Sequence, residues 1–143
     1  MLQRGTIRST TDTFELATSV LYQSPVQHFG LTPNNLDEQP ELVLDFIREV
    51  PATWDETQFV DGYPGKHVVL ARRQGNHWYV VAVNGEKSVK ELSVNLPMLA
   101  GKSVQLLFDN ANNKTQSKKV TVPDNGLMKL SLMGQGGVVL VAR

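Results

Sequence analysis

The residues of this chain that could bind a metal ion are few and widely spaced. The three histidines are His28, His67 and His77, and none lies in an H-x-H or H-E-x-x-H arrangement. His67 and His77 flank a predicted hairpin and could approach one another, but two imidazoles without a nearby carboxylate make a poor site. The chain contains no cysteine, which excludes disulfides, thiolate zinc sites and cysteine nucleophiles. We therefore predict no metal site and no cofactor in this chain.

The carboxylates do not form an acid–base pair. Asp55 and Glu56 are adjacent, so in a strand they point to opposite faces, whereas glycoside hydrolysis needs two carboxyl groups on one cleft. Residues 109–113 resemble a calcium loop, yet Ala111 stands where an oxygen ligand is required. The glycine-rich stretch 134–137 lacks the following helix of a phosphate-binding loop. No catalytic residue is therefore predicted.

Aromatic side chains are the remaining candidates for a binding site. Trp54, Tyr63, Trp78 and Tyr79 could stack on sugar rings if they were exposed together. Trp78 and Tyr79 are neighbours in a predicted strand, so we expect at least one of them to face the core. We retain Tyr63 and Trp78 as candidate carbohydrate contacts, with packing in the core or between domains as the ordinary alternative.

The first 52 residues have the pattern of helices. Residues 9–12 offer N-caps, and the apolar stripe that follows predicts a helix over about 12–23. A second helical pattern opens at Pro40, after the cap-and-proline pair Thr32-Pro33, and ends at Pro51. The two apolar faces include Phe14, Ala17 and Leu21 in the first helix and Phe46, Ile47 and Val50 in the second. Two such helices cannot form a core alone, so they must pack either on the β region or on structure outside this chain.

From Trp54 onward the apolar residues recur at a period of two, which is typical of strands. The strand runs are 57–60, 68–71, 78–83, 89–94, 103–108, 119–122, 127–132 and 138–142. Asn84-Gly85 predicts a type I′ hairpin that joins 78–83 to 89–94. Eight short strands at regular spacing predict an antiparallel sandwich or barrel. The predicted fold is α+β, with a helical segment over 1–52 and a β-sandwich domain over 53–143.

Composition excludes several classes of protein. The chain has 143 residues, 41% of them hydrophobic and 20% charged, and its formal net charge is zero. This composition is globular, and the absence of a basic excess argues against non-specific nucleic-acid binding. Residues 1–52 carry three basic and seven acidic side chains, whereas residues 53–143 carry eleven and seven. No apolar run approaches the roughly 20 residues of a membrane-spanning helix, and the N-terminus lacks the pattern of a signal peptide.

Three motifs resemble the C-terminal end of glycoside hydrolase family 97. They are V-P-x-x-W-D-E-T at 50–57, D-G-Y-P-G at 61–65 and V-x-A-R-R at 69–73. The resemblance implies an α-glucosidase or α-galactosidase in which a catalytic (β/α)₈ barrel precedes a C-terminal β-sandwich. The family's catalytic carboxylates and calcium ligands lie upstream, so the resemblance implies calcium in the parent's barrel and assigns no catalytic residue here.

The resemblance also sets expectations about partners. Residues 1–52 would be the last helices of the barrel, and the chain would be a C-terminal fragment whose partner is the missing barrel. We expect Phe14, Ala17, Leu21, Phe46, Ile47, Val50 and Trp54 to pack between domains, and the isolated chain to self-associate through this exposed surface. The family implies a periplasmic or extracytoplasmic location in a bacterium. The alternatives are a sandwich that binds α-linked oligosaccharides through Tyr63 or Trp78, and a free-standing enzyme.

Overall fold

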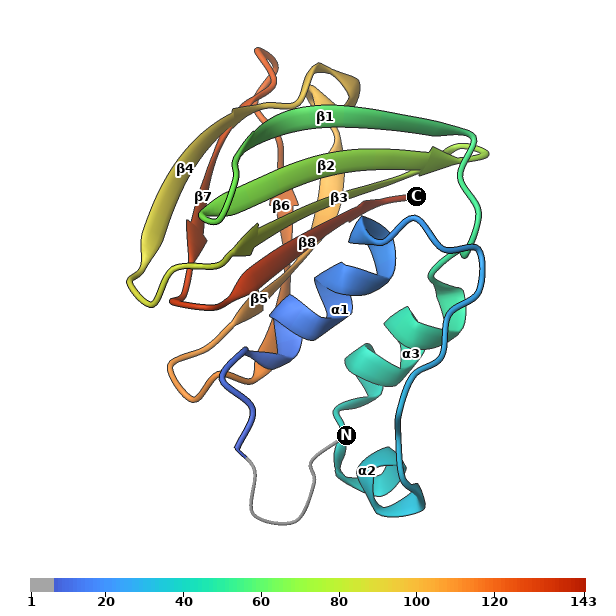
Figure 1. The fold of residues 1–143 in the computed structure, drawn as a ribbon. Helices are drawn as coiled ribbons and strands as arrows, with labels where there is room; N and C mark the ends of the chain where they lie inside the picture. Colours follow the sequence, from blue (N-terminus) through green and yellow to red (C-terminus); the bar gives the residue numbers. More distant parts are fainter. Residues whose placement is uncertain (1–6) are drawn as a thin grey trace.

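The computed structural model describes residues 7–143, which form helices followed by strands (Figure 1). The helices are α1 (Asp12–Leu21), α2 (Pro33–Glu38) and α3 (Glu41–Glu49), and a 3₁₀ turn spans Pro97–Leu99. The strands are β1 (Glu56–Tyr63), β2 (His67–Gln74), β3 (His77–Asn84), β4 (Lys90–Asn95), β5 (Ser103–Asp109), β6 (Thr115–Thr121), β7 (Leu127–Leu132) and β8 (Gly137–Ala142). The predicted α+β class is confirmed.

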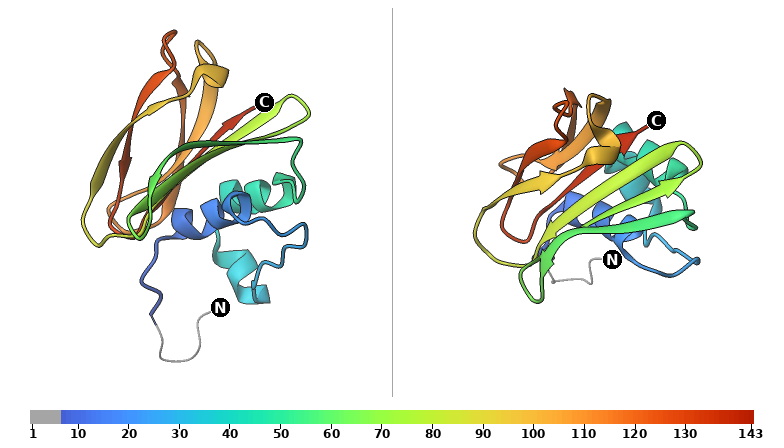
Figure 2. Two further views of the ribbon diagram at one scale, coloured as in Figure 1. Left: turned by 45° about the horizontal axis from the view of Figure 1, so that its top comes forward. Right: turned by 90° about the horizontal axis from the view of Figure 1, so that it is seen from above.

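The strands form two antiparallel sheets that pack face to face (Figure 2). The larger sheet has the order β1-β2-β3-β8-β5-β6, and β4 pairs with β7 in the smaller one. Aliphatic side chains from both sheets, among them Val80, Leu130 and Leu140, fill the space between them. Since every strand pairs antiparallel, the alternating apolar pattern of β4 and β7 places one face in this core and the other in water.

The outer face of the larger sheet is covered by helices α1 and α3 (Figure 1). Leu16, Ala17 and Val20 of α1 and Phe46 of α3 meet Tyr79 of β3 in a second apolar cluster. Strands β3 and β8 lie beneath α1 and are therefore buried on both faces, which explains their nearly continuous apolar sequences. The sequence leaves open whether the helices pack on the β region or on structure outside this chain. In the structure, their apolar faces pack on the β region.

Helices α1 and α2 begin at caps that the local sequence supplies. The hydroxyl of Thr11 accepts from the Phe14 amide at 3.2 Å, so Thr11 is the N-cap of α1 and Asp12 is its first helical residue. Thr32 and Asn35 form a reciprocal capping box at the start of α2, with Pro33 as the first helical residue.

The hairpin predicted at Asn84-Gly85 is wrong. Asn84 is fully buried and still belongs to β3, where it pairs with His67 of β2. Its amide nitrogen donates to the carbonyls of Ser88 at 2.8 Å and Met133 at 3.1 Å. These bonds hold the chain as it crosses to the other sheet, so β4 pairs with β7 instead of β3. The Asn-Gly motif does not reveal these hydrogen bonds of the Asn84 side chain. They favour a crossover to the smaller sheet over a tight turn.

Candidate functional site

The structure separates the residues that the sequence singles out for chemistry. His67 and His77 lie at opposite ends of the β2–β3 hairpin, because the hairpin turns at Gly75 and Asn76, so the two rings are far apart. The Nε2 atom of His67 lies 3.1 Å from a carboxylate oxygen of Asp61. His28 is exposed in the loop before α2. Within residues 7–143, no three histidine, aspartate or glutamate side chains converge on a common point.

The two candidate carbohydrate contacts also lie apart. Tyr63 is 62% exposed at the end of β1, whereas Trp78 is 8% exposed and belongs to the core between the sheets. The Trp78 ring therefore presents no face to a sugar. The guanidinium carbon of Arg73 lies over this ring, 6.0 Å from its centre.

The seven residues predicted to pack between domains all belong to the cluster between the helices and the larger sheet. Ala17 and Phe46 are buried, and Phe14, Leu21, Ile47, Val50 and Trp54 are partly buried against the cluster. Phe46 and Trp54 both meet the Tyr79 ring edge-on, at centroid distances of 6.4 and 5.4 Å. Burial raises the pKa of the Tyr79 hydroxyl. The expectation that an isolated chain exposes this surface is wrong for Ala17 and Phe46, since the sheet already covers them.

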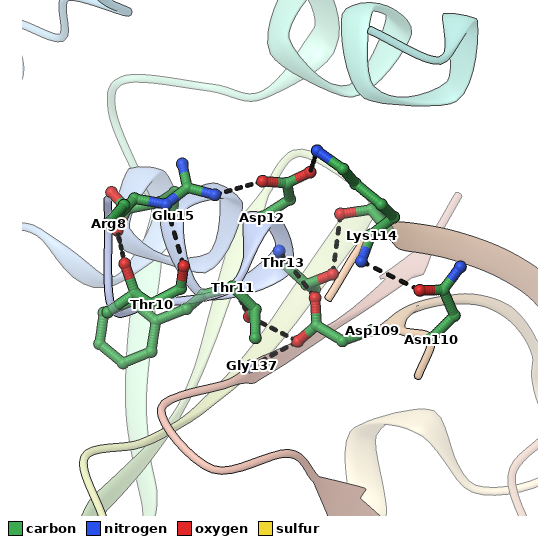
Figure 3. A network of polar contacts seen from close by, with 12 residues as sticks. Arg8, Thr10, Thr11, Asp12, Thr13, Glu15, Asp109, Asn110, Lys114 and Gly137 are labelled. Atoms are coloured by element: carbon green, nitrogen blue, oxygen red, sulfur yellow. Dashed lines mark hydrogen bonds and ion pairs between the residues drawn. The ribbon is translucent and has the colours of Figure 1, made fainter. Parts of the chain in front are cut away.

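A carboxylate of the β-sandwich fixes the start of α1 (Figure 3). Asp109, at the end of β5, accepts the Thr11 hydroxyl at 2.6 Å and the Thr13 amide at 3.1 Å. It also accepts the amide of Gly137 at 3.2 Å, and the hydroxyls of Thr13 and Thr115 lie 2.8 Å apart beside it. A negative charge at a helix N-terminus is favourable, because it meets unpaired amides and the positive end of the helix dipole. The sequence marks Asp109 only as part of a polar turn.

The hydrogen bonds of Asp109 explain why residues 109–113 are polar although they do not fit a calcium site. Its carboxylate is surrounded by hydrogen-bond donors, which compete with a cation for the same oxygen atoms. Asn110 turns inward and accepts the amides of Asn112 and Lys114. The donor set therefore fits a helix anchor and does not fit calcium.

The glycine-rich stretch 134–137 lets α1 approach the sheet closely. A Cβ on Gly137 would lie 2.9 Å from the Cα of Phe14. The carbonyl of Gln135 accepts the Thr11 amide at 3.1 Å. Gly137 and the Gln135 carbonyl thus contact the first turn of α1.

Arg72 is a charged residue in the layer between the helices and the sheet. It is 1% exposed, and burial lowers the pKa of its guanidinium. One nitrogen, Nη1, donates to the Tyr22 carbonyl at 2.8 Å, at the end of α1. The guanidinium carbon lies 5.7 Å from the centre of the Trp54 ring. Arg72 therefore connects the C-terminal end of α1 to β2, as Asp109 connects its N-terminal end to β5.

Two concave surfaces adjoin α1. The first, which we call the helix cleft, has a volume of about 340 Å³ and lies between α1, the loop 24–31 and α3. Polar side chains such as Glu15, Thr18 and Gln39 line it, together with Tyr22 and Phe29. The second, the β1 corner, has a volume of about 520 Å³ and lies at the turn between β1 and β2. It is lined by Phe14, Phe59, Gly62, Tyr63, Pro64, Gly65, Lys66, His67, Val68, Val83 and Gly85.

A comparison with protein families decides where the chain belongs. Residues 53–143 match the family model described as glycosyl-hydrolase 97 C-terminal, oligomerisation. The chain belongs to glycoside hydrolase family 97. This confirms the resemblance carried by the three motifs, and it identifies the sandwich as the family's C-terminal domain.

Longer relatives place this family 97 domain within larger enzymes. The chain is 32% identical over 133 residues to a retaining alpha-galactosidase of Bacteroides thetaiotaomicron. It is 30% identical over 135 residues to a probable retaining alpha-galactosidase of Streptomyces bingchenggensis. The alignments cover 88% and 92% of this chain and 20% of either relative, so the chain spans about a fifth of their length.

Solved structures agree with this placement. The crystal structure of a beta-arabinopyranosidase superposes with a TM-score of 0.93 at 51% identity, over 96% of this chain and 22% of that one. A family 97 enzyme of Pseudoalteromonas sp. strain K8, in complex with panose, superposes with a TM-score of 0.77 at 26% identity. That match covers 92% of this chain and 22% of the enzyme. The longest helix within residues 7–143 has ten residues, too few to cross a bilayer.

Proposed function

We propose that this chain is a non-catalytic C-terminal domain that supports the catalytic part of a family 97 glycosidase and brings copies of the enzyme together. The observation that carries the proposal is the anchoring of α1, which binds the sandwich at both ends and along its apolar face. A helix held in this way can transmit a fixed position to whatever packs on its other side. The helix cleft contains two carboxylates, Asp12 and Glu15. Asp12 is paired with Arg8 and Lys114, and Glu15 accepts the Thr10 hydroxyl.

The outer side of the helix layer supports the same role. Nine large apolar side chains are exposed in the described part of the chain, and five of them lie within residues 7–36. These five are Ile7, Tyr22, Val26, Phe29 and Leu36. Three of them, Tyr22, Val26 and Phe29, line the helix cleft, and exposed apolar side chains that gather at a cleft are typical of an interface. We assign the helix cleft as the seat of the catalytic part of the enzyme.

The names of the relatives suggest a substrate class for the parent enzyme. Two relatives are called alpha-galactosidases, and the structure at 51% identity is called a beta-arabinopyranosidase. An α-D-galactoside and a β-L-arabinopyranoside share the configuration of their ring hydroxyls and differ in one hydroxymethyl group. We propose that the parent acts on glycosides of this configuration, with the catalytic carboxylates outside this chain.

A binding experiment tests the proposed seat. The catalytic part of the beta-arabinopyranosidase relative, expressed without its C-terminal domain, should form a complex with this chain in gel filtration. Replacing Phe29 by Asp should weaken that complex at least tenfold, because the change puts a charge at the interface. The matched variant Leu127→Asp, on the small sheet, should bind as the wild type does. Equal binding by both variants, or no complex with the wild type, would contradict the proposed seat.

A further inference from the structure

The β1 corner carries two large exposed rings at one edge of the larger sheet. Phe59 is 69% exposed and Tyr63 is 62% exposed, although both belong to β1. The Phe59 ring lies across Gly62, whose missing Cβ would come within 3.2 Å of it. Pro64 and Val68 extend the apolar surface. Large apolar side chains that are exposed together on one surface are typical of a site that another protein covers.

We infer that the β1 corner is the surface through which two copies of this domain associate. The inference rests on the proposed function and on the family model, which is described as an oligomerisation domain. The corner and the helix cleft lie on different sides of α1, because Phe14 lines the corner while Asp12 and Ser19, on the other face of the helix, line the cleft. A second copy on the corner therefore leaves the seat of the catalytic part free.

The charges at the corner fit a two-fold contact. The ammonium of Lys66 lies 5.4 Å from the centre of the Tyr63 ring, and the nearby Asp61 side chain is 46% exposed. In a two-fold interface the same patch contacts itself, so a patch must contain its own complement. Lys66 of one copy can face Asp61 of the other, and the chain's formal net charge of zero adds no repulsion between copies.

The contact runs through side chains and not through strand pairing. β1 is an edge strand, but its register with β2 shifts between Phe59 and Asp61. Such a bulge interrupts the row of free amides and carbonyls that another strand would need. The exposed parts of the two rings supply on the order of 300 Å² per copy, whereas a standard interface buries about 800 Å² per partner. The two rings thus form only the centre of the interface. Because they bury less area than a standard interface, association of the isolated domain should be weak.

A carbohydrate fits the corner less well. Sugar sites place several polar groups around the ring hydroxyls. The polar side chains that line this corner are Lys66 and His67, and His67 is already bound to Asp61. A protein surface of apolar centre and charged rim matches this lining better.

Sedimentation velocity of the full 143-residue chain up to several hundred micromolar tests the inference. The wild type should dimerise, and Phe59→Ser or Tyr63→Ser should each weaken the dimer at least ~30-fold, as removal of a central aromatic does. The control Leu127→Ser removes a side chain that is 55% exposed in β7 and should leave the dimer unchanged. Circular dichroism should show the same fold in all four proteins.

Four results would overturn the inference. Three of them are a wild type that stays monomeric throughout, dimers that survive both aromatic substitutions, and equal weakening by the Leu127 control. A fourth is saturable binding of galactose or maltose, measured by calorimetry, that is lost in Tyr63→Ser while the wild type is monomeric. The seat of the catalytic part has a separate test, since a monomeric chain that still binds the catalytic part of the relative would overturn the contact between copies and support the seat.

Discussion

Asp109 and Arg72 are the single residues that define the position of α1 on the sandwich. Asp109 receives three donors at the start of the helix, and Arg72 donates to the Tyr22 carbonyl at its end. Both side chains are ionisable and partly or fully buried, which in an enzyme would suggest catalysis. Here their partners are backbone groups and hydroxyls of the same chain. Both side chains use their hydrogen bonds to hold α1 on the sandwich, which agrees with the proposed supporting role.

Removing the Asp109 carboxylate should loosen the start of α1. We expect Asp109→Ala to lower the free energy of unfolding by about 2–3 kcal/mol, because it leaves the Thr13 and Gly137 amides without an acceptor. Urea titration followed by circular dichroism measures the change. Asn112→Ala, an exposed side chain in the same loop, should alter stability by less than ~0.5 kcal/mol. Similar losses in both variants would contradict the anchoring role.

Arg72 gives the opposite expectation. Its buried guanidinium makes one hydrogen bond and has no carboxylate partner within residues 7–143, and such a buried cation carries a desolvation cost. We expect Arg72→Met, which keeps the length of the side chain, to change the free energy of unfolding by less than ~1 kcal/mol or to raise it. A loss above ~2 kcal/mol in chemical denaturation would show that the Tyr22 contact dominates.

At the scale of elements, the helix layer depends on a few aromatic contacts. Phe46 of α3 is 5% exposed and packs edge-on against Tyr79. We expect Phe46→Ala to cost about 3–4 kcal/mol, from lost burial and the cavity that remains. Leu36→Ala in α2, where the side chain is 49% exposed, should cost less than ~0.5 kcal/mol. Thermal unfolding of the two variants compares them directly, and equal melting temperatures would show that α3 contributes little to the core.

The β1–β2 hairpin should respond to acid through Glu56. Hydrogen bonds from Gln58 and then Arg73 lower the pKa of this carboxyl below its ordinary value of 4.5. A carboxyl with a lowered pKa in the folded state stabilises the fold above the unfolded pKa, and this contribution is lost as the pH falls through the folded value. Between pH 5 and about pH 3, Glu56→Gln should therefore lose less stability than the wild type. Parallel acid limbs in urea titrations of the two proteins would contradict this assignment.

The sequence predicts the elements better than their partners. Apolar periodicity indicates α1, α3 and all eight strands, since the spacing of buried residues is a local property. It misses the pairing of β4, because the buried bonds of Asn84 link residues 49 positions apart. It also misses the role of Asp109, whose donors on α1 lie 96 and 98 positions away. Contacts of this range depend on topology and leave no local pattern to find.

At the scale of the whole molecule, the helical segment and the sandwich carry opposite net charges and are joined by ion pairs. Residues 1–52 are acidic and residues 53–143 are basic. Lys114 of the sandwich lies 3.2 Å from Asp12 of α1, and Arg143 is paired with Glu49 of α3. These exposed pairs add little stability individually, but they match the orientation that the shared apolar core imposes. The helices and the sandwich thus form one body.

Hydrolysis by a relative that lacks this domain tests the central claim most directly. The beta-arabinopyranosidase relative, truncated before its C-terminal domain, should lose stability and turnover of its aryl glycoside substrate. Addition of this chain should restore both, while this chain alone should hydrolyse neither that substrate nor aryl α-galactosides or α-glucosides. Turnover by the chain alone, abolished by changing Asp55 or Glu56, would show that the domain is itself an enzyme. A truncated relative that is unaffected by the chain would show that the domain gives no support.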